Sequence, residues 1–211
     1  YPFFHRWNKV TWNGPADQRT LLLADYVYLN NHLANFYGVA TNATDDFVKV
    51  TLDPGQRAGV LTHPYLLSTF AYQKQTSPIH RGVFLTRNIV GRSLKPPPMA
   101  QTFDDATFAP NLTMREKVAQ LTRSQACQNC HSVINPLGFS LEHYDAVGRF
   151  RTRENDRPID AVSEYTTDEG QTTRLTGARA CATWSRPSIP TRWSWPAAAK
   201  RNWRCAGRWP A

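Results

Sequence analysis

Long hydrophobic runs are absent from this 211-residue sequence. No stretch of about 18 apolar residues occurs, so we predict no membrane-spanning helix. A signal peptide is also lacking, yet the first residue is Tyr1 rather than methionine. We therefore expect the chain to begin inside a longer protein, with its export signal and flanking domains outside this sequence. Hydrophobic residues make up 41% of the chain, which is enough for a globular core.

Acidic residues are absent from the C-terminal part of the chain. From Gln171 to Ala211 there are eight Lys/Arg and no Asp or Glu, whereas the preceding 170 residues hold 17 Lys/Arg and 16 Asp/Glu. The net charge of +9 therefore comes from the tail, and the body is close to neutral. A nucleic-acid-binding function, which requires a basic face on the folded body, is not expected.

Among the residues that are present, the most informative are Cys127-Gln128-Asn129-Cys130-His131, the CxxCH attachment signature of a c-type haem. The spacing follows from the chemistry, because two thiols add to the vinyl groups of one porphyrin and the adjoining imidazole binds the iron. We therefore predict covalent haem c, with thioethers at Cys127 and Cys130. His131 is the predicted proximal iron ligand.

The CxxC spacing also serves zinc sites, redox dithiols and disulfides. A structural zinc site needs about four ligands, usually in two spaced pairs, but Cys181 and Cys205 stand 24 residues apart. A thioredoxin-like dithiol would sit at a helix N-terminus, whereas the segment before this motif is predicted to be helical. Haem is favoured over these alternatives, which stay open.

No methionine follows His131, although small soluble cytochromes c usually take their sixth iron ligand from that side. The distal ligand could be Met99, Met114, His63, His80 or His143, or none of them. Downstream of the motif, apolar residues could wall a haem crevice and arginines could pair with a propionate. Alternatively, these residues are ordinary core and surface. The residues concerned are Phe139, Leu141, Tyr144, Phe150, Arg149 and Arg151.

Helical patterns predominate before the motif. Apolar periodicity over Thr20–Gly38 predicts a helix, or a helical pair broken near Asn30. A second helix is predicted from Pro78 to Val90, ended by Gly91. The capping box Thr113–Glu116 leads a third helix toward Gln125, which would place the CxxCH motif at or just beyond a helix C-terminus.

Other patterns are shorter. Val48–Leu52 alternates and predicts a strand, and Lys95–Met99 predicts an extended polyproline linker. We therefore predict a mainly α fold, in which a helical domain with a Pro-rich linker leads into a cytochrome-c-like haem-binding segment.

After about Ala178 the composition changes. Five of the seven Trp and two of the four Cys fall in this tail, mixed with Arg, Pro and Ala and without helix or strand periodicity. We interpret it as a frameshifted translation of GC-rich DNA. A Trp-rich interaction tail is the alternative.

Several stretches resemble the multidomain haem-motif proteins of planctomycetes and related environmental bacteria, which carry domains of unknown function 1592, 1588 and 1585 in that order. The resemblance rests on Leu22–Asn30 with Leu33-Ala34 and Tyr37-Gly38, on Arg57–His63, Thr76–Gly82 and Pro96–Pro98, and on Asn135–Glu142 with Tyr144–Arg149. It implies the end of a 1592-like domain over residues 1–45, a 1588-like domain over 46–135, the start of a 1585-like domain over 136–178 and an atypical tail over 179–211.

The resemblance implies an exported, haem-c-bearing protein but no firm activity. We expect a c-type haem electron-transfer module of a larger periplasmic or cell-surface protein, serving an unidentified redox partner. One alternative is a catalytic haem oxidoreductase subunit, acting on a substrate such as carbohydrate. Another is a non-haem structural or interaction module with a CxxC disulfide or metal staple.

Overall fold

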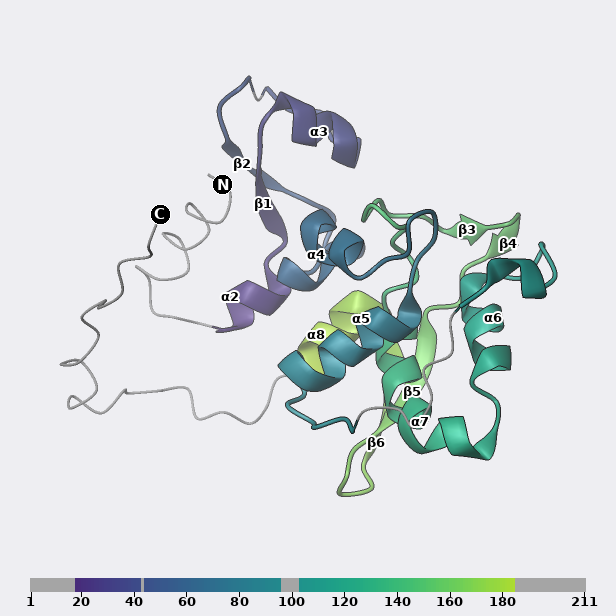
Figure 1. Cartoon of the computed structure of the whole chain (residues 1–211). Helices are drawn as coiled ribbons and strands as arrows, with labels where there is room; N and C mark the ends of the chain where they lie inside the picture. Colours follow the sequence, from purple (N-terminus) through teal and green to yellow (C-terminus); the bar gives the residue numbers. More distant parts are fainter. Residues whose placement is uncertain (1–17, 43, 96–102, 185–211) are drawn as a thin grey trace, which may run out of the picture.

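A computed structural model describes residues 18–42, 44–95 and 103–184 (Figure 1). Seven α-helices occur in these ranges: α2 Gln18–Leu23, α3 Asn31–Tyr37, α4 Pro64–Thr69, α5 Pro78–Phe84, α6 Met114–Leu121, α7 Gln125–Phe139 and α8 Ala178–Trp184. A π-helical turn, Leu85–Ile89, continues α5, and 3-10 turns occupy Gly59–Thr62 and Asp105–Thr107.

The strands form three separate antiparallel pairs. They are β1 Tyr26–Leu29 with β2 Val48–Thr51, β3 Arg153–Glu154 with β4 Arg157–Pro158, and β5 Val162–Thr166 with β6 Thr172–Thr176. The prediction of a mainly α fold is therefore wrong, and the described part of the chain is mixed α/β.

The error at the N-terminal end has a clear cause. Thr20–Gly38 was predicted to be helical, but Tyr26–Leu29 is the strand β1, and Tyr26 pairs with Thr51. Alternate β1 side chains, Val27 and Leu29, are buried in a small cluster with Ala34 and Leu52. The partner strand begins 19 residues after β1 ends. A search for apolar periodicity looks only at neighbouring residues, so it could not detect this pairing.

Local boundary signals were predicted more accurately. Gly38 ends α3 in the left-handed conformation (φ 66°), as a helix-stopping glycine does. Pro78 occupies the first turn of its predicted helix. The Thr113–Glu116 capping box is formed from both sides at the start of α6. The predicted polyproline linker lies outside the described residues from Pro96 onward.

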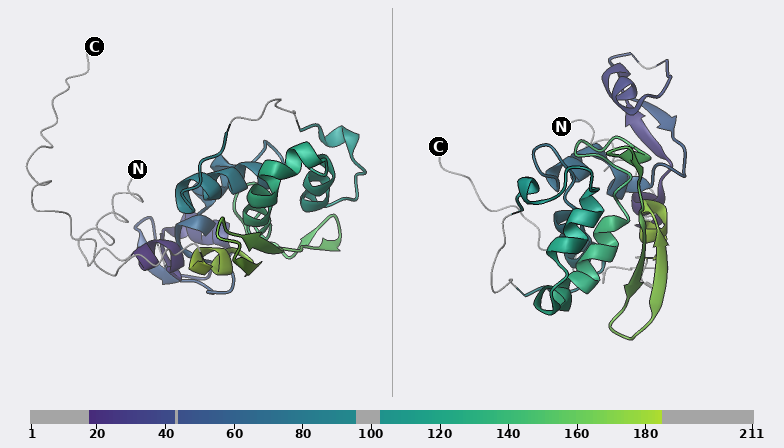
Figure 2. Two further views of the ribbon diagram at one scale, coloured as in Figure 1. Left: turned by 90° about the horizontal axis from the view of Figure 1, so that it is seen from below. Right: turned by 90° about the vertical axis from the view of Figure 1, so that its right-hand side faces the viewer.

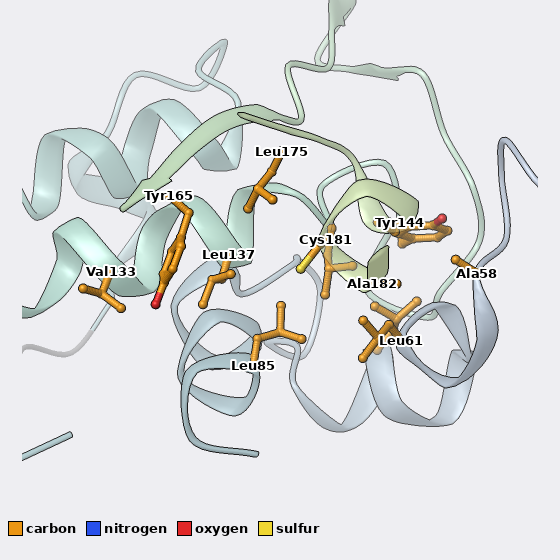
Figure 3. Close-up of a cluster of buried hydrophobic side chains, with 13 residues drawn as sticks. Ala58, Leu61, Leu85, Val133, Leu137, Tyr144, Tyr165, Leu175, Cys181 and Ala182 are labelled. Atoms are coloured by element: carbon orange, nitrogen blue, oxygen red, sulfur yellow. The ribbon is translucent and has the colours of Figure 1, made fainter. Parts of the chain in front are cut away.

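The main core gathers side chains from residues 58 to 182 (Figure 3). Leu137 of α7 and Cys181 of α8 are both fully buried in it. Packing thus crosses the predicted boundary at residue 135, which lies inside α7, and it includes the first residues of the predicted tail. The domain division itself stays a prediction, and residues 185–211 lie outside the described part.

Helices α5 and α7 approach each other closely because glycines stand at their contact. A Cβ added to Gly82 would collide with the Ile134 carbonyl oxygen, and one added to Gly138 would collide with that of Pro78. Strand β5 of the β5–β6 hairpin packs on α7, and α8 packs on β6 (Figure 2). Helix α7 is therefore the central element, and it is also the helix that carries the CxxCH motif.

Candidate functional site

The CxxCH motif occupies the first two turns of α7 rather than a helix C-terminus, so that prediction is wrong. Helix α6 ends at Leu121, and a short break precedes a new N-cap at Ser124. The Ser124 hydroxyl accepts a hydrogen bond from the backbone N–H of Cys127 (3.4 Å). A serine cap three residues before a cysteine was the sequence signal for a helix start at this point.

The helical spacing places the three motif residues on one face of α7. Cys127, Cys130 and His131 stand at positions i, i+3 and i+4, which are neighbours on a helix surface. All three side chains are half-buried, and both thiols are free. The Ser124 hydroxyl donates to the Cys127 sulfur (3.1 Å). The face is thus partly accessible, and the Ser124 side chain orders the turn that carries Cys127.

The orientation of His131 depends on a buried polar chain. Its Nδ1 lies 2.9 Å from the Asn135 side-chain oxygen, and the Asn135 amide donates to the Thr122 hydroxyl (2.8 Å). That hydroxyl donates in turn to the Val118 carbonyl (2.8 Å). Because an amide oxygen only accepts, this arrangement suits a His131 that donates from Nδ1, and Nε2 is then the ring nitrogen that remains for a ligand.

Asn135 and Thr122 were missed in the sequence. Asn135 is 7% exposed and Thr122 is 2% exposed, so they form a desolvated support behind a half-buried imidazole. Metal-binding histidines are typically held by such a partner on their second nitrogen. The available signal was a polar residue one helical turn beyond His131, on the same side of α7.

This donor set is compatible with haem c. Two free thiols on one helical face, one turn apart, and an adjacent imidazole with a free Nε2 are the groups that covalent attachment and proximal ligation require. A zinc site requires several ligands converging on one point. Within residues 18–42, 44–95 and 103–184, no group of three His, Cys, Asp or Glu side chains is arranged to hold a metal ion.

The distal-ligand candidates have other contacts. Met114 is 1% exposed and packs against Val118 and Phe139. His63 caps α4, its Nδ1 accepting from the Tyr65 N–H (3.2 Å). Burial, assisted by the charge of Arg57, lowers the pKa of His63 to about 4.

His80 and His143 are also engaged. His80 Nδ1 lies 3.0 Å from the Ser77 hydroxyl, and His143 Nδ1 lies 3.0 Å from the Arg151 carbonyl. Met99 lies outside the described residues. Each of the four described candidates thus already has contacts of its own, and the distal ligand stays open.

The proposed crevice residues belong mainly to the protein core. Leu141 and Tyr144 are in the main cluster with Phe150 against it, while Phe139 belongs to a second cluster. Phe139 also stands about 12 Å further along α7 than His131, at 1.5 Å per residue. The structure therefore supports the alternative interpretation, in which these aromatic and aliphatic residues are ordinary core residues.

The two arginines proposed as propionate partners have acidic neighbours. Arg149 contacts Asp145 (3.5 Å), and Arg151 contacts Glu142 (3.7 Å) and Glu154 (3.2 Å).

A buried charge network orders the loop that follows α7. Arg81 is fully buried and donates to the carbonyl oxygens of Leu141, Tyr144, Leu67 and Asp145. Glu142, 2% exposed, accepts from the Thr76 hydroxyl (2.9 Å) and lies 3.8 Å from Arg81. Arg81 thus acts mainly as a clamp for the backbone that follows α7.

Burial dominates the titration of this network. It raises the pKa of Glu142 to about 7, against the opposing effect of Arg81 and Arg151. It also lowers the pKa of Arg81 to about 10, against the opposing effect of Glu142. Both charged forms are therefore destabilised by desolvation more than the long ion pair stabilises them.

Comparison with known proteins identifies one related family. Residues 57–154 match PSCyt3, a protein of unknown function (DUF1588). This range contains α4 to α7, the CxxCH motif and the Arg81–Glu142 network. No curated protein and no solved structure matches the chain. Among the helices of the described residues, none is long and apolar enough to cross a membrane.

Proposed function

We propose that this chain is a c-type haem electron-transfer module of a larger exported protein. Cys127 and Cys130 would hold the haem through thioethers, and His131 would bind its iron through Nε2. When bound, haem c supplies a one-electron Fe(III)/Fe(II) couple. The observation that carries the proposal is the part-buried hydrogen bond between His131 Nδ1 and Asn135, because it leaves Nε2 as the imidazole nitrogen that could bind iron.

The remaining side chains would support this role without taking part in bond changes. Asn135 and Thr122 fix the His131 tautomer, and the Ser124 cap orders the turn that carries Cys127. Covalent attachment requires export and reduced thiols, so the module would act in the periplasm or at the cell surface. Electrons would pass to an unidentified partner or to flanking domains of the same protein.

The test is expression with an added signal peptide in cells that carry the cytochrome c maturation machinery. We expect an α-band that survives acid–acetone extraction, and a mass increase of one haem. Cys127→Ala and Cys130→Ala should each leave at most one thioether and shift the pyridine haemochrome band. Ser132→Ala, an exposed neighbour on the same helix, is the matched control and should keep full attachment.

Carbon monoxide then separates the electron-transfer role from the catalytic alternative. A reduced spectrum unchanged by carbon monoxide indicates six-coordinate iron and supports electron transfer. A spectrum that shifts indicates an open iron position and favours a catalytic haem subunit. Recovery of the exported protein without haem, but with stoichiometric zinc, would contradict both.

One observation favours a second candidate, a redox dithiol. The cysteine pair lies at the start of a helix, the position used by thiol–disulfide oxidoreductases, and the Ser124 hydroxyl contacts the Cys127 sulfur. For this candidate, alkylation and mass spectrometry of the exported protein should find a haem-free Cys127–Cys130 disulfide that dithiothreitol reduces. Quantitative haem attachment would exclude it, since both thiols would then be consumed.

A further inference from the structure

A groove of about 410 Å³ lies beside Arg57 and is lined by residues of α3, of the segment after β2 and of the loop after α7. The α3 side contributes Phe36 and Tyr37, and the loop contributes Arg149 and Phe150. Its volume falls in the range of small-molecule sites, about 300–1,000 Å³. None of these residues belongs to the CxxCH face.

Arg57 is held rigidly beside this groove. The residue is 8% exposed, and its Nη1 donates to the carbonyl oxygens of Thr62 and Gly148, both at 2.9 Å. The guanidinium lies between two aromatic rings, 4.5 Å from the centroid of Tyr37 and 5.3 Å from that of Tyr144. A guanidinium fixed in this way loses little further freedom when a ligand binds.

The charge of Arg57 lacks an ionic partner among the described residues. No carboxylate of this part of the chain lies within ion-pair distance, and Nε and Nη2 donate to none of its groups. Asp145 is paired instead with Arg149 (3.5 Å). Burial lowers the pKa of Arg57, because a desolvated cation is costly, although the charge of Asp145 acts in the opposite direction. An anion brought into the groove would offset that cost.

The other residues of the groove indicate what the uncharged part of a ligand would contact. Phe36 and Phe150 offer apolar faces, and Arg149 lies over the Phe36 ring at 5.7 Å. Asp53 also lines the groove, but its Oδ1 already accepts from the Gly55 N–H (2.8 Å). Since Arg149 is paired with Asp145, Arg57 is the lining cation that has no ion pair among the described residues.

We propose that this groove binds a small organic carboxylate with an apolar or aromatic body. The carboxylate would accept hydrogen bonds from Nε and Nη2 of Arg57, the fork geometry in which guanidinium and carboxylate groups pair best. The body would lie against Phe36 and Phe150. A protein partner would need about 800 Å² of surface on this side, so the size of the groove favours a small molecule.

The test uses the full chain, with benzoate as the probe and benzamide as its uncharged isostere at matched ionic strength. Nuclear magnetic resonance titration should show benzoate binding in the millimolar range, with shifts centred on Phe36, Arg57 and Phe150. Benzamide should bind about tenfold more weakly, the difference expected for losing a charged fork contact. This readout does not depend on haem, so it is independent of the proposed function.

Two variants locate the binding. Arg57→Lys keeps the charge but loses the fork, and it should weaken benzoate binding about tenfold. Arg149→Gln, an exposed change that leaves the Arg57 clamp intact, should weaken it about threefold. Arg174→Gln, on the exposed side of β6, is the matched control and should have no effect.

Three results would overturn the proposal. Benzoate and benzamide could bind equally, benzoate could shift resonances only outside the groove, or Arg174→Gln could weaken binding as much as Arg149→Gln. If Arg57→Lys does not fold, the comparison of Arg149→Gln with Arg174→Gln still decides the matter.

Discussion

The two ends of helix α7 are held by different forces. At its N-terminal end, Cys127, Cys130 and His131 are half-buried and depend on a cap and one hydrogen-bond chain. At its C-terminal end, Leu137 is fully buried and Gly138 touches the backbone of α5. The protein thus presents its reactive residues on the outer turns of a helix whose other end is fixed in the core, which combines access with precise placement.

The largest effect should come from breaking the buried end. Gly138→Ala would drive a methyl group into the Pro78 carbonyl, and neither backbone can retreat without moving α5. We expect a loss of about 3 kcal/mol in unfolding free energy, measured by urea denaturation. Gly55→Ala, where the nearest atom is the Asp53 side chain at 3.2 Å, is the control and should cost far less. Equal losses would show that the α5–α7 contact is looser than described.

The next effect concerns pH at the same end. Because burial raises the folded-state pKa of Glu142 to about 7, the folded protein binds a proton more tightly than the unfolded chain does. The stabilisation of the folded state by this protonated carboxyl is complete below the ordinary glutamate pKa. It is lost as the pH rises toward and through about 7. Glu142→Gln should make the unfolding free energy depend less on pH between the ordinary glutamate pKa and about 7. Glu164→Gln, exposed on β5, should leave this pH dependence unchanged.

A smaller effect is expected where the buried end supports the reactive end. Asn135→Ala removes the acceptor for His131 Nδ1 and leaves the Thr122 hydroxyl without its donor. We expect a loss of about 2 kcal/mol in unfolding free energy. In ¹⁵N spectra of the haem-free protein, the His131 ring should shift to a mixture of tautomers. Asn129→Ala, exposed on the same helix, should change neither quantity.

At the outer turns, Ser124→Ala removes the N-cap of α7 and should cost about 1 kcal/mol. The loss should be concentrated there, as faster hydrogen exchange at the amides of Cys127 and Gln128. Ser132→Ala, in mid-helix and exposed, serves as the reference. Uniformly faster exchange along the whole helix would mean that its two ends are not independent.

The smallest effect is expected at a motif cysteine. Cys130→Ser should change the unfolding free energy of the haem-free protein by no more than about 0.5 kcal/mol, because the side chain is only half-buried. Cys181→Ser places a hydroxyl in the fully buried core and should cost clearly more. If the two cysteines cost the same, the motif face is more deeply packed than the structure indicates.

Sequence patterns predicted the features whose signals are short. The capping box at Thr113–Glu116, the proline start of α5 and the glycine stop of α3 are all present, because each depends on residues within one turn. The mistaken feature is one whose partner is distant: β1 was predicted to be helical, but it pairs with β2 across a long connection. The β5–β6 hairpin, for which nothing was predicted, packs on α7 and α8.

The same division applies to the candidate site. The amino-acid order alone places two thiols and an imidazole within five consecutive residues, and that spacing is what identifies the CxxCH motif. Tertiary structure decides that the motif begins a helix, that Asn135 and Thr122 stand behind His131, and that the neighbouring aromatic residues belong to the core. Spacing along the chain fixes which atoms can react together, whereas burial and hydrogen-bond direction depend on elements that only folding brings into contact.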